Sequence, residues 1–88
     1  LYVGVRGAGS IAVLGIGADG VPLPIGMESC AGDWPRHHVQ AGQALIVANQ
    51  LSNTIVAFGL NAEDGRPDRR LSCLKLESPT CLAAQTLP

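Results

Sequence analysis

The feature of this chain that most restricts its fold is an internal repeat that spans most of its length. Residues 1–6 align with residues 45–50, and residues 10–16 align with residues 54–60, at a constant offset of 44 and without a gap. The identical pairs in these stretches are Leu1 and Leu45, Val3 and Val47, Ile11 and Ile55, and Gly15 and Gly59. The fold must therefore be built from copies of one unit of about 44 residues.

The residues within each repeat favour strands over helices. Val and Ile are frequent, and both suit pleated surfaces. Gly and Pro interrupt most stretches before a helix could reach three turns. The strands predicted for the complete repeat are about 37–40, 44–49, 54–60 and 69–76, those for the partial repeat before it are 2–5, 11–16 and part of 21–27, and residues 81–85 are expected to begin another innermost strand.

Repeats of this length with four short strands are typical of β-propeller blades. We therefore expect an all-β chain that forms roughly two four-stranded antiparallel blades. Residues 1–33 would be the end of one blade, residues 34–77 one full blade, and residues 78–88 the start of the closing strand. Two blades leave sheet faces uncovered, so the chain is interpreted as a fragment whose partners include the missing blades. The alternative is a small β protein that closes by forming oligomers.

Composition excludes several classes of partner. The net charge is −1 and the six basic residues form no stripe, so no nucleic acid is expected to bind. No apolar run approaches the roughly 18 residues of a membrane helix, so no membrane partner is expected. The three cysteines are odd in number and lack CxxC spacing, which favours free thiols over a disulfide framework or a zinc site. We expect no metal, no cofactor and a cytoplasmic location.

The chain also carries a series of short motifs at characteristic spacing. They are LYVGVRG at 1–7 with SIAV at 10–13, WPRH at 34–37, LIVANQ at 45–50 with NTIVAF at 53–58, and SPTCL at 78–82. In this order they resemble the C-terminal end of lactonase-type β-propellers of the 6-phosphogluconolactonase family. The resemblance implies a fragment of a seven-bladed ring. It also implies a parent enzyme that opens 6-phospho-D-glucono-1,5-lactone to 6-phosphogluconate in the pentose phosphate pathway.

The number of strands in a blade brings a set of polar residues to one face of the propeller. In a four-stranded up-and-down blade, the loop entering the innermost strand and the loop after the second strand lie on the same face. Residues 35–37 enter an innermost strand, whereas residues 6–9 and 49–52 follow second strands. The residues expected at the channel mouth are Arg6, Arg36, His37, Asn49 and Gln50.

These residue types suit the hydrolysis of a phosphorylated lactone. Arg36 is the candidate for binding the phosphate or the oxyanion, because a guanidinium binds two oxygens at once. His37 is the candidate base, since histidine ordinarily titrates near pH 6.5. Arg6, Asn49 and Gln50 are the candidates for substrate binding.

Two other functions stay open from the sequence. One is a non-catalytic propeller that binds a ligand on the same face, and the other is a lactone enzyme of the muconate-cyclase type, which this fold also hosts. A site at the mouth of a propeller draws on several blades. The chain alone is therefore expected to be inactive.

Overall fold

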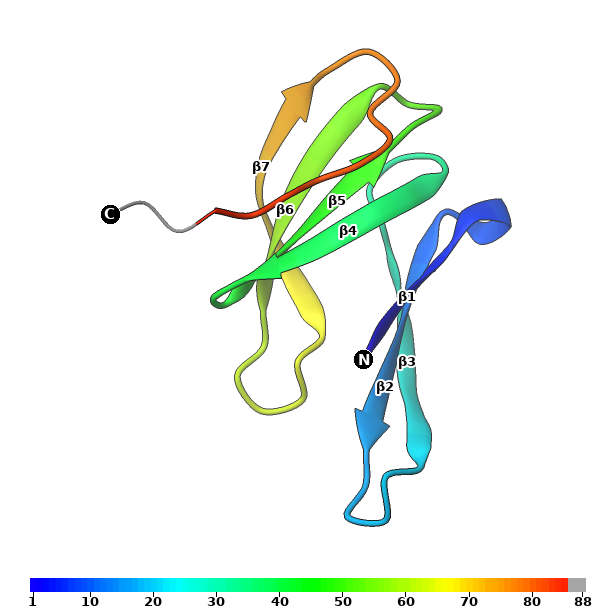
Figure 1. Ribbon diagram of the computed structural model, residues 1–88, viewed down its shortest axis with the longest axis vertical. Helices are drawn as coiled ribbons and strands as arrows, with labels where there is room; N and C mark the ends of the chain where they lie inside the picture. Colours follow the sequence, from blue (N-terminus) through cyan, green and yellow to red (C-terminus); the bar gives the residue numbers. More distant parts are fainter. Residues whose placement is uncertain (86–88) are drawn as a thin grey trace.

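The structure is a computed structural model and describes residues 1–85. It contains two antiparallel sheets and a single 3-10 turn, η1 (Arg6–Ala8) (Figure 1). The first sheet has the order β1-β2-β3, with strands β1 (Tyr2–Val5), β2 (Ser10–Ile16) and β3 (Pro22–Ser29). The second has the order β4-β5-β6-β7, with strands β4 (Pro35–Ala41), β5 (Ala44–Asn49), β6 (Thr54–Leu60) and β7 (Pro67–Lys75). The expected all-β class and the four-stranded blade are confirmed.

The predicted strands agree closely with the observed ones at the centre of each sheet. Strands β1, β5 and β6 have the predicted bounds, and β2 begins one residue earlier than predicted, at Ser10. Strands β4 and β7 each begin two residues earlier, at Pro35 and Pro67. Both prolines are buried and start their strands, where a missing N–H removes no ladder hydrogen bond.

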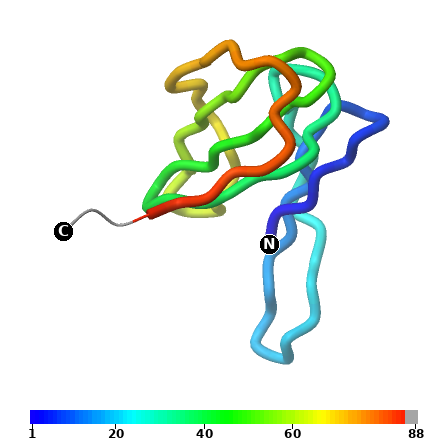
Figure 2. The backbone as a smooth tube through the Cα atoms, turned by 45° about the horizontal axis from the view of Figure 1, so that its top comes forward, coloured from blue at the N-terminus to red at the C-terminus, as the bar shows by residue number. Residues whose placement is uncertain are grey.

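The strand predicted for residues 81–85 is wrong for this chain. The segment is extended but joins no sheet, and it crosses the four-stranded sheet beside β4 (Figures 1 and 2). An innermost strand pairs with the second strand of its own blade, and the residues that the structure describes after β7 form no such strand. The rest of the predicted closing segment, residues 86–88, lies outside the described residues.

The repeat extends to the backbone conformation at positions where the residue types differ. Gly9 and Asn53 have φ values of 59° and 56°. Trp34 and Ser78 have φ values of 61° and 46°. Each pair is separated by the same offset of 44, and left-handed backbone is strained for Trp and Ser. The unusual conformation of Trp34 is thus repeated at Ser78, one repeat length later.

The hydrophobic core lies between the two sheets. Residues opposite each other on antiparallel strands share a face, so Leu45 lies beside Phe58 and Val47 beside Val56. This face packs against Ile11 of β2, and none of these five side chains is more than 6% exposed. Burying each such side chain contributes roughly 1.5–3 kcal/mol relative to leaving it in water. The contact between successive repeats is therefore the main source of cohesion in the chain.

Polar contacts join the sheets at the end opposite to the loops that carry the predicted site. The Tyr2 hydroxyl donates to the carbonyl oxygen of Gly65 at 2.5 Å. Burial, followed by the nearby Asp64 carboxylate, raises the pKa of Tyr2, so this phenol stays a donor. Arg66 forms an ion pair with Glu28, with Nε and Oε1 2.7 Å apart. These contacts link the two sheets at this end of the molecule.

Three further features complete the description of residues 1–85. None of their helices is long and apolar enough to cross a membrane. The three cysteines are free thiols, with Cys30 buried and the other two exposed. No group of three metal-ligating side chains occurs in this part of the chain.

Candidate functional site

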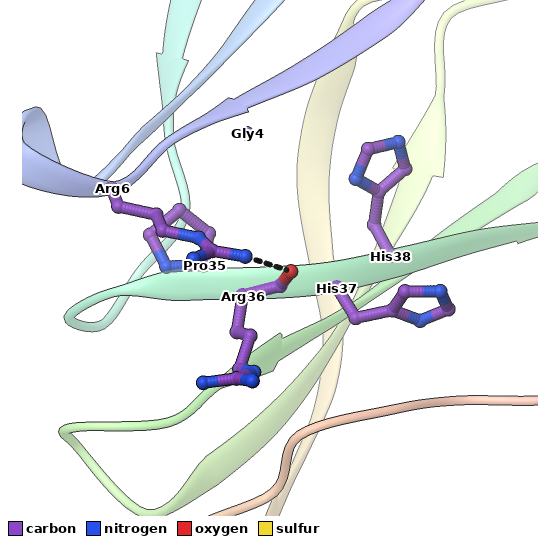
Figure 3. Close-up of a pocket in the computed structure, with 6 residues that line it drawn as sticks. All are labelled: Gly4, Arg6, Pro35, Arg36, His37 and His38. Atoms are coloured by element: carbon purple, nitrogen blue, oxygen red, sulfur yellow. Dashed lines mark hydrogen bonds between the residues drawn. The ribbon is translucent and has the colours of Figure 1, made fainter.

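A hollow of about 330 Å³ opens between β1 and the start of β4 (Figure 3). It lies along the edge of β4 with which no strand pairs in the part of the chain that the structure describes. The residues that line it are Gly4, Arg6, Pro35, Arg36, His37 and His38. The close approach of the two strands depends on Gly4, because a Cβ atom there would lie 2.7 Å from the carbonyl oxygen of Pro35.

Arg36 occupies a β-bulge at the start of β4. Pro35 pairs with Asn49 and His37 pairs with Ala48, so Arg36 is an extra residue with no partner on β5. A bulge bends the strand locally and redirects the extra side chain. The Arg36 side chain consequently leaves the sheet, and its Nη1 donates to Oε1 of Gln50 at 3.1 Å.

Hydrogen bonds connect three of the predicted site residues. Arg6 Nη2 donates to the carbonyl oxygen of Arg36 at 3.2 Å, and Arg36 in turn contacts Gln50. The Gln50 Nε2 then donates to the Ser78 hydroxyl at 3.3 Å. Within residues 1–85, neither Arg6 nor Arg36 has a carboxylate oxygen within 4.0 Å. The site therefore presents two exposed, uncompensated cations that come from successive repeats.

The two histidines of β4 point to opposite sides of the strand, as the alternation of a strand requires (Figure 3). The His38 ring meets Tyr2 edge-on, with ring centroids 6.5 Å apart and an angle of 79°. Burial, followed by the charge of His37, lowers the pKa of His38. On the other side, His37 Nδ1 accepts a hydrogen bond from the backbone N–H of Leu82 at 3.0 Å.

The structure places Asn49 in the core, not in the substrate site predicted for it. Its side chain is 0% exposed, and its Nδ2 donates to the carbonyl oxygen of Cys30 at 2.9 Å. Asn49 therefore holds the segment that connects the two blades and offers no surface to a ligand. The sequence contained an indication that this position is buried, because the repeat partner of Asn49 is the apolar residue Val5.

Three features of the site escaped the sequence prediction. These are the close approach at Gly4, the link from Gln50 to Ser78, and the backbone N–H of Leu82. The close approach at Gly4 could have been predicted, since a Gly within a strand often marks the place where another backbone comes near. The other two depend on how the segment after β7 crosses the sheet, which no local pattern reveals.

Comparisons with known proteins identify the family. The family model described as Lactonase, 7-bladed beta-propeller, matches residues 1–84. The periplasmic gluconolactonase PpgL of Pseudomonas aeruginosa has a TM-score of 0.76 and 23% identity, over 81% of this chain and 20% of that one. A proposed 6-phosphogluconolactonase of Bacteroides fragilis has a TM-score of 0.83 and 23% identity, over 91% of this chain and 23% of that one.

No match was found among curated proteins. The matched part is 20% and 23% of the length of the two solved structures, which fits fewer than two of seven blades. The repeat, the antiparallel sheets and the family match agree on one architecture, of which this chain is a fragment. The chain belongs to the family of seven-bladed lactonase β-propellers.

Proposed function

We propose that this chain is part of a lactone hydrolase whose substrate is 6-phospho-D-glucono-1,5-lactone and whose product is 6-phosphogluconate. The observation that carries the proposal is the pair of exposed guanidinium groups of Arg6 and Arg36, joined through the Arg36 carbonyl and free of carboxylate partners within residues 1–85. Such groups bind phosphate oxygens in pairs. Both solved relatives are named for lactones, and one name includes a phosphate.

The reaction needs donors for the substrate and a base for the attacking water. The water oxygen bonds to the lactone carbonyl carbon, and the ring carbon–oxygen bond breaks. One water proton ends on the released ring oxygen, and the other leaves when the new carboxyl group ionises. In our proposal Arg6 and Arg36 bind the anionic substrate, and Gln50 contacts a sugar hydroxyl. The base belongs to a blade beyond this chain, which is why these residues alone would lack activity.

The cellular setting of this reaction is also a proposal. The three free thiols favour a cytoplasmic location, where a phosphorylated sugar lactone would be retained with the other sugar phosphates. The relative PpgL is named as periplasmic, so the two locations would correspond to different lactones.

The test is a set of substitutions in the complete propeller that carries this chain. Arg36→Ala should lower kcat/KM for the phosphorylated lactone by roughly 100- to 1000-fold, as loss of one preorganised donor does. Arg36→Lys should restore part of this, since an ammonium group cannot bind two oxygens in one plane. An Arg36→Ala enzyme with an undiminished rate would refute the assignment.

Two controls accompany this series. Arg69→Ala removes an exposed arginine of β7 whose only ion-pair partner within residues 1–85 is its neighbour Asp68, and it should leave the rate unchanged. Unphosphorylated gluconolactone serves as a second substrate. If the arginines bind the phosphate, Arg36→Ala should cost little with this substrate. Binding of the phosphorylated lactone without any hydrolysis by the native protein would instead support a non-catalytic binding propeller.

A further inference from the structure

We propose that His37 serves this site as a hydrogen-bond donor through its Nε2–H and not as the base, and that the backbone N–H of Leu82 fixes this role. The inference rests on the proposed lactone hydrolysis for its substrate, but the state of the ring follows from the structure by itself. It replaces the role that sequence analysis predicts for His37.

The direction of one hydrogen bond decides the state of the ring. The Leu82 nitrogen lies 3.0 Å from His37 Nδ1, in a partly buried contact between residues far apart in the sequence. A backbone N–H can only donate, so Nδ1 must accept and cannot itself carry a proton. A neutral imidazole has one proton, and it must then be on Nε2.

This state leaves His37 without a nitrogen that can act as a base. The lone pair of Nδ1 is used by the Leu82 N–H, and Nε2 already carries the proton. A general base needs an unprotonated atom within hydrogen-bond reach of the attacking water. Protonating Nδ1 would also set two N–H groups against each other across the 3.0 Å contact.

With its proton on Nε2, His37 can act as a hydrogen-bond donor at the channel mouth. Its Nε2–H has no partner within residues 1–85, and Arg36 and Arg6 line the same hollow as His37. All three side chains therefore offer donors and no acceptor for a proton. The Nε2–H of His37 suits a substrate oxygen that gains negative charge, and the lactone carbonyl oxygen does so when water adds to its carbon.

Leu82 acts here as a positioning residue, through the ring of His37. Its amide belongs to the segment that follows Pro79, the repeat partner of Pro35, and so to the start of the next unit. His37 belongs to the unit before it. The tautomer is consequently set by one blade for a histidine carried by its neighbour, and neither blade alone determines it.

The first test reads the tautomer directly and requires no activity. Long-range ¹H–¹⁵N spectra of the complete protein near about pH 8 distinguish the two neutral tautomers of each histidine, and a His37→Gln spectrum identifies the His37 signals. We expect Nε2–H in the native protein and in Leu82→Ala, which keeps the amide. Leu82→Pro removes the N–H, and a mixture of tautomers should result. A native His37 protonated on Nδ1 would overturn the inference.

The second test separates a donor from a base. A glutamine side chain can place an N–H near the position of Nε2, whereas asparagine is too short. We expect His37→Asn to lower kcat by roughly 100- to 1000-fold and His37→Gln to stay within about tenfold of the native enzyme. The rising limb of the pH–rate profile should be unchanged in His37→Gln, because the base is another group.

The outcomes of the two tests have different meanings. Equal losses in His37→Gln and His37→Asn, together with disappearance of the rising limb, would show that His37 is the base and would refute the inference. A native protein with the expected tautomer but no lactone hydrolysis would refute the proposed function and leave the donor state of His37 intact.

Discussion

Gly4 is the position where a single added atom would most disturb the contact between the two blades. A Cβ atom there would lie 2.7 Å from the carbonyl oxygen of Pro35, which belongs to the backbone and cannot rotate away. We expect Gly4→Ala to destabilise the protein by roughly 1–3 kcal/mol in urea unfolding, because β1 and β4 must separate. Gly7→Ala is the control. An added Cβ at Gly7 meets nothing within 4 Å, so the change should stay within about 0.5 kcal/mol.

His38 should make stability depend on pH. Burial, followed by the charge of His37, lowers its pKa from the ordinary value of 6.5, so the unfolded chain takes up a proton at higher pH than the folded one. Stability is then full above about pH 6.5 and falls as the pH approaches the lower pKa of the folded state. The melting temperature should drop between about pH 7.5 and about pH 5. His38→Phe, which keeps a ring against Tyr2, should drop less, and an equal drop would refute the assignment.

At the scale of single residues, the sequence predicted where Arg6, Arg36 and Gln50 gather but not the role of every neighbour. The number of strands in a blade is enough to bring loops to one face, and the hydrogen bonds among these three residues follow from it. Asn49 was misplaced because the segment that connects the two blades covers this strand end, and the local sequence does not reveal the path of that segment. The tautomer of His37 depends on an amide 45 residues away.

At the scale of elements, the Arg66–Glu28 pair joins two hairpins that local structure leaves independent. The Arg66 side chain reaches from the loop before β7 to β3 and contacts Glu28 through both Nε and Nη2. Both side chains are partly exposed, at 40% and 29%, so a double-mutant cycle should give a coupling of about 0.5–1 kcal/mol. The Arg69–Asp68 pair is the control, since its residues are adjacent and its contact is 3.4 Å.

One result of the double-mutant cycle on Arg66 and Glu28 would contradict this prediction. A coupling for Arg66 and Glu28 no larger than that for Arg69 and Asp68 would show that the ion pair does not hold the sheets together. The hydrophobic contact around Ile11 and Val47 would then hold the two blades in place by itself.

The strands could be predicted because the same pattern of strand-forming residues and turns occurs twice in the sequence. The loops between strands, the glycines at turns and the β-branched residues occur at equivalent positions in both copies of the repeat. The first and last residues of β5 and β6 could therefore be predicted correctly. The bulge at Arg36 could not be predicted, because it appears only in the pairing of β4 with β5, and the repeat partner of β4, residues 79–85, joins no sheet that would show it a second time.

At the scale of the whole molecule, each sheet has one face that no other sheet within residues 1–85 covers. Through the repeat, these two faces are equivalent to the two faces that already pack against each other between the sheets. The face of β5 and β6 formed by Leu45, Val47, Val56 and Phe58 is buried against β2. Its repeat partners are Leu1, Val3, Ala12 and Leu14 on the outer face of the first sheet, where Leu1 is 58% and Val3 44% exposed. The face of the second sheet turned away from β2 carries Ile46, Ile55, Ala57 and Leu74, of which Leu74 is 60% exposed. One molecule thus carries both surfaces of a blade-to-blade contact.

The segment after β7 strengthens this complementarity. Residues 79–85 are the repeat partners of residues 35–41, which form the innermost strand of the complete blade. An innermost strand is the one that the three-stranded sheet lacks. A second copy that docks its first sheet on the far face of β4–β7 would therefore gain both apolar cover and a fourth strand.

We expect the 88-residue chain on its own to associate head to tail through these faces, with a mass in light scattering that rises with concentration. Val3→Arg blocks one face and Leu74→Arg blocks the other, so each variant alone should be monomeric. An equimolar mixture should form a dimer and nothing larger, because each variant keeps one intact face and the two intact faces are complementary. Leu51→Arg, at an exposed leucine in the loop after β5, should associate like the native chain. A native chain that stays monomeric at high concentration, or a mixture that stays monomeric, would show that the uncovered faces do not recognise each other without the rest of the ring.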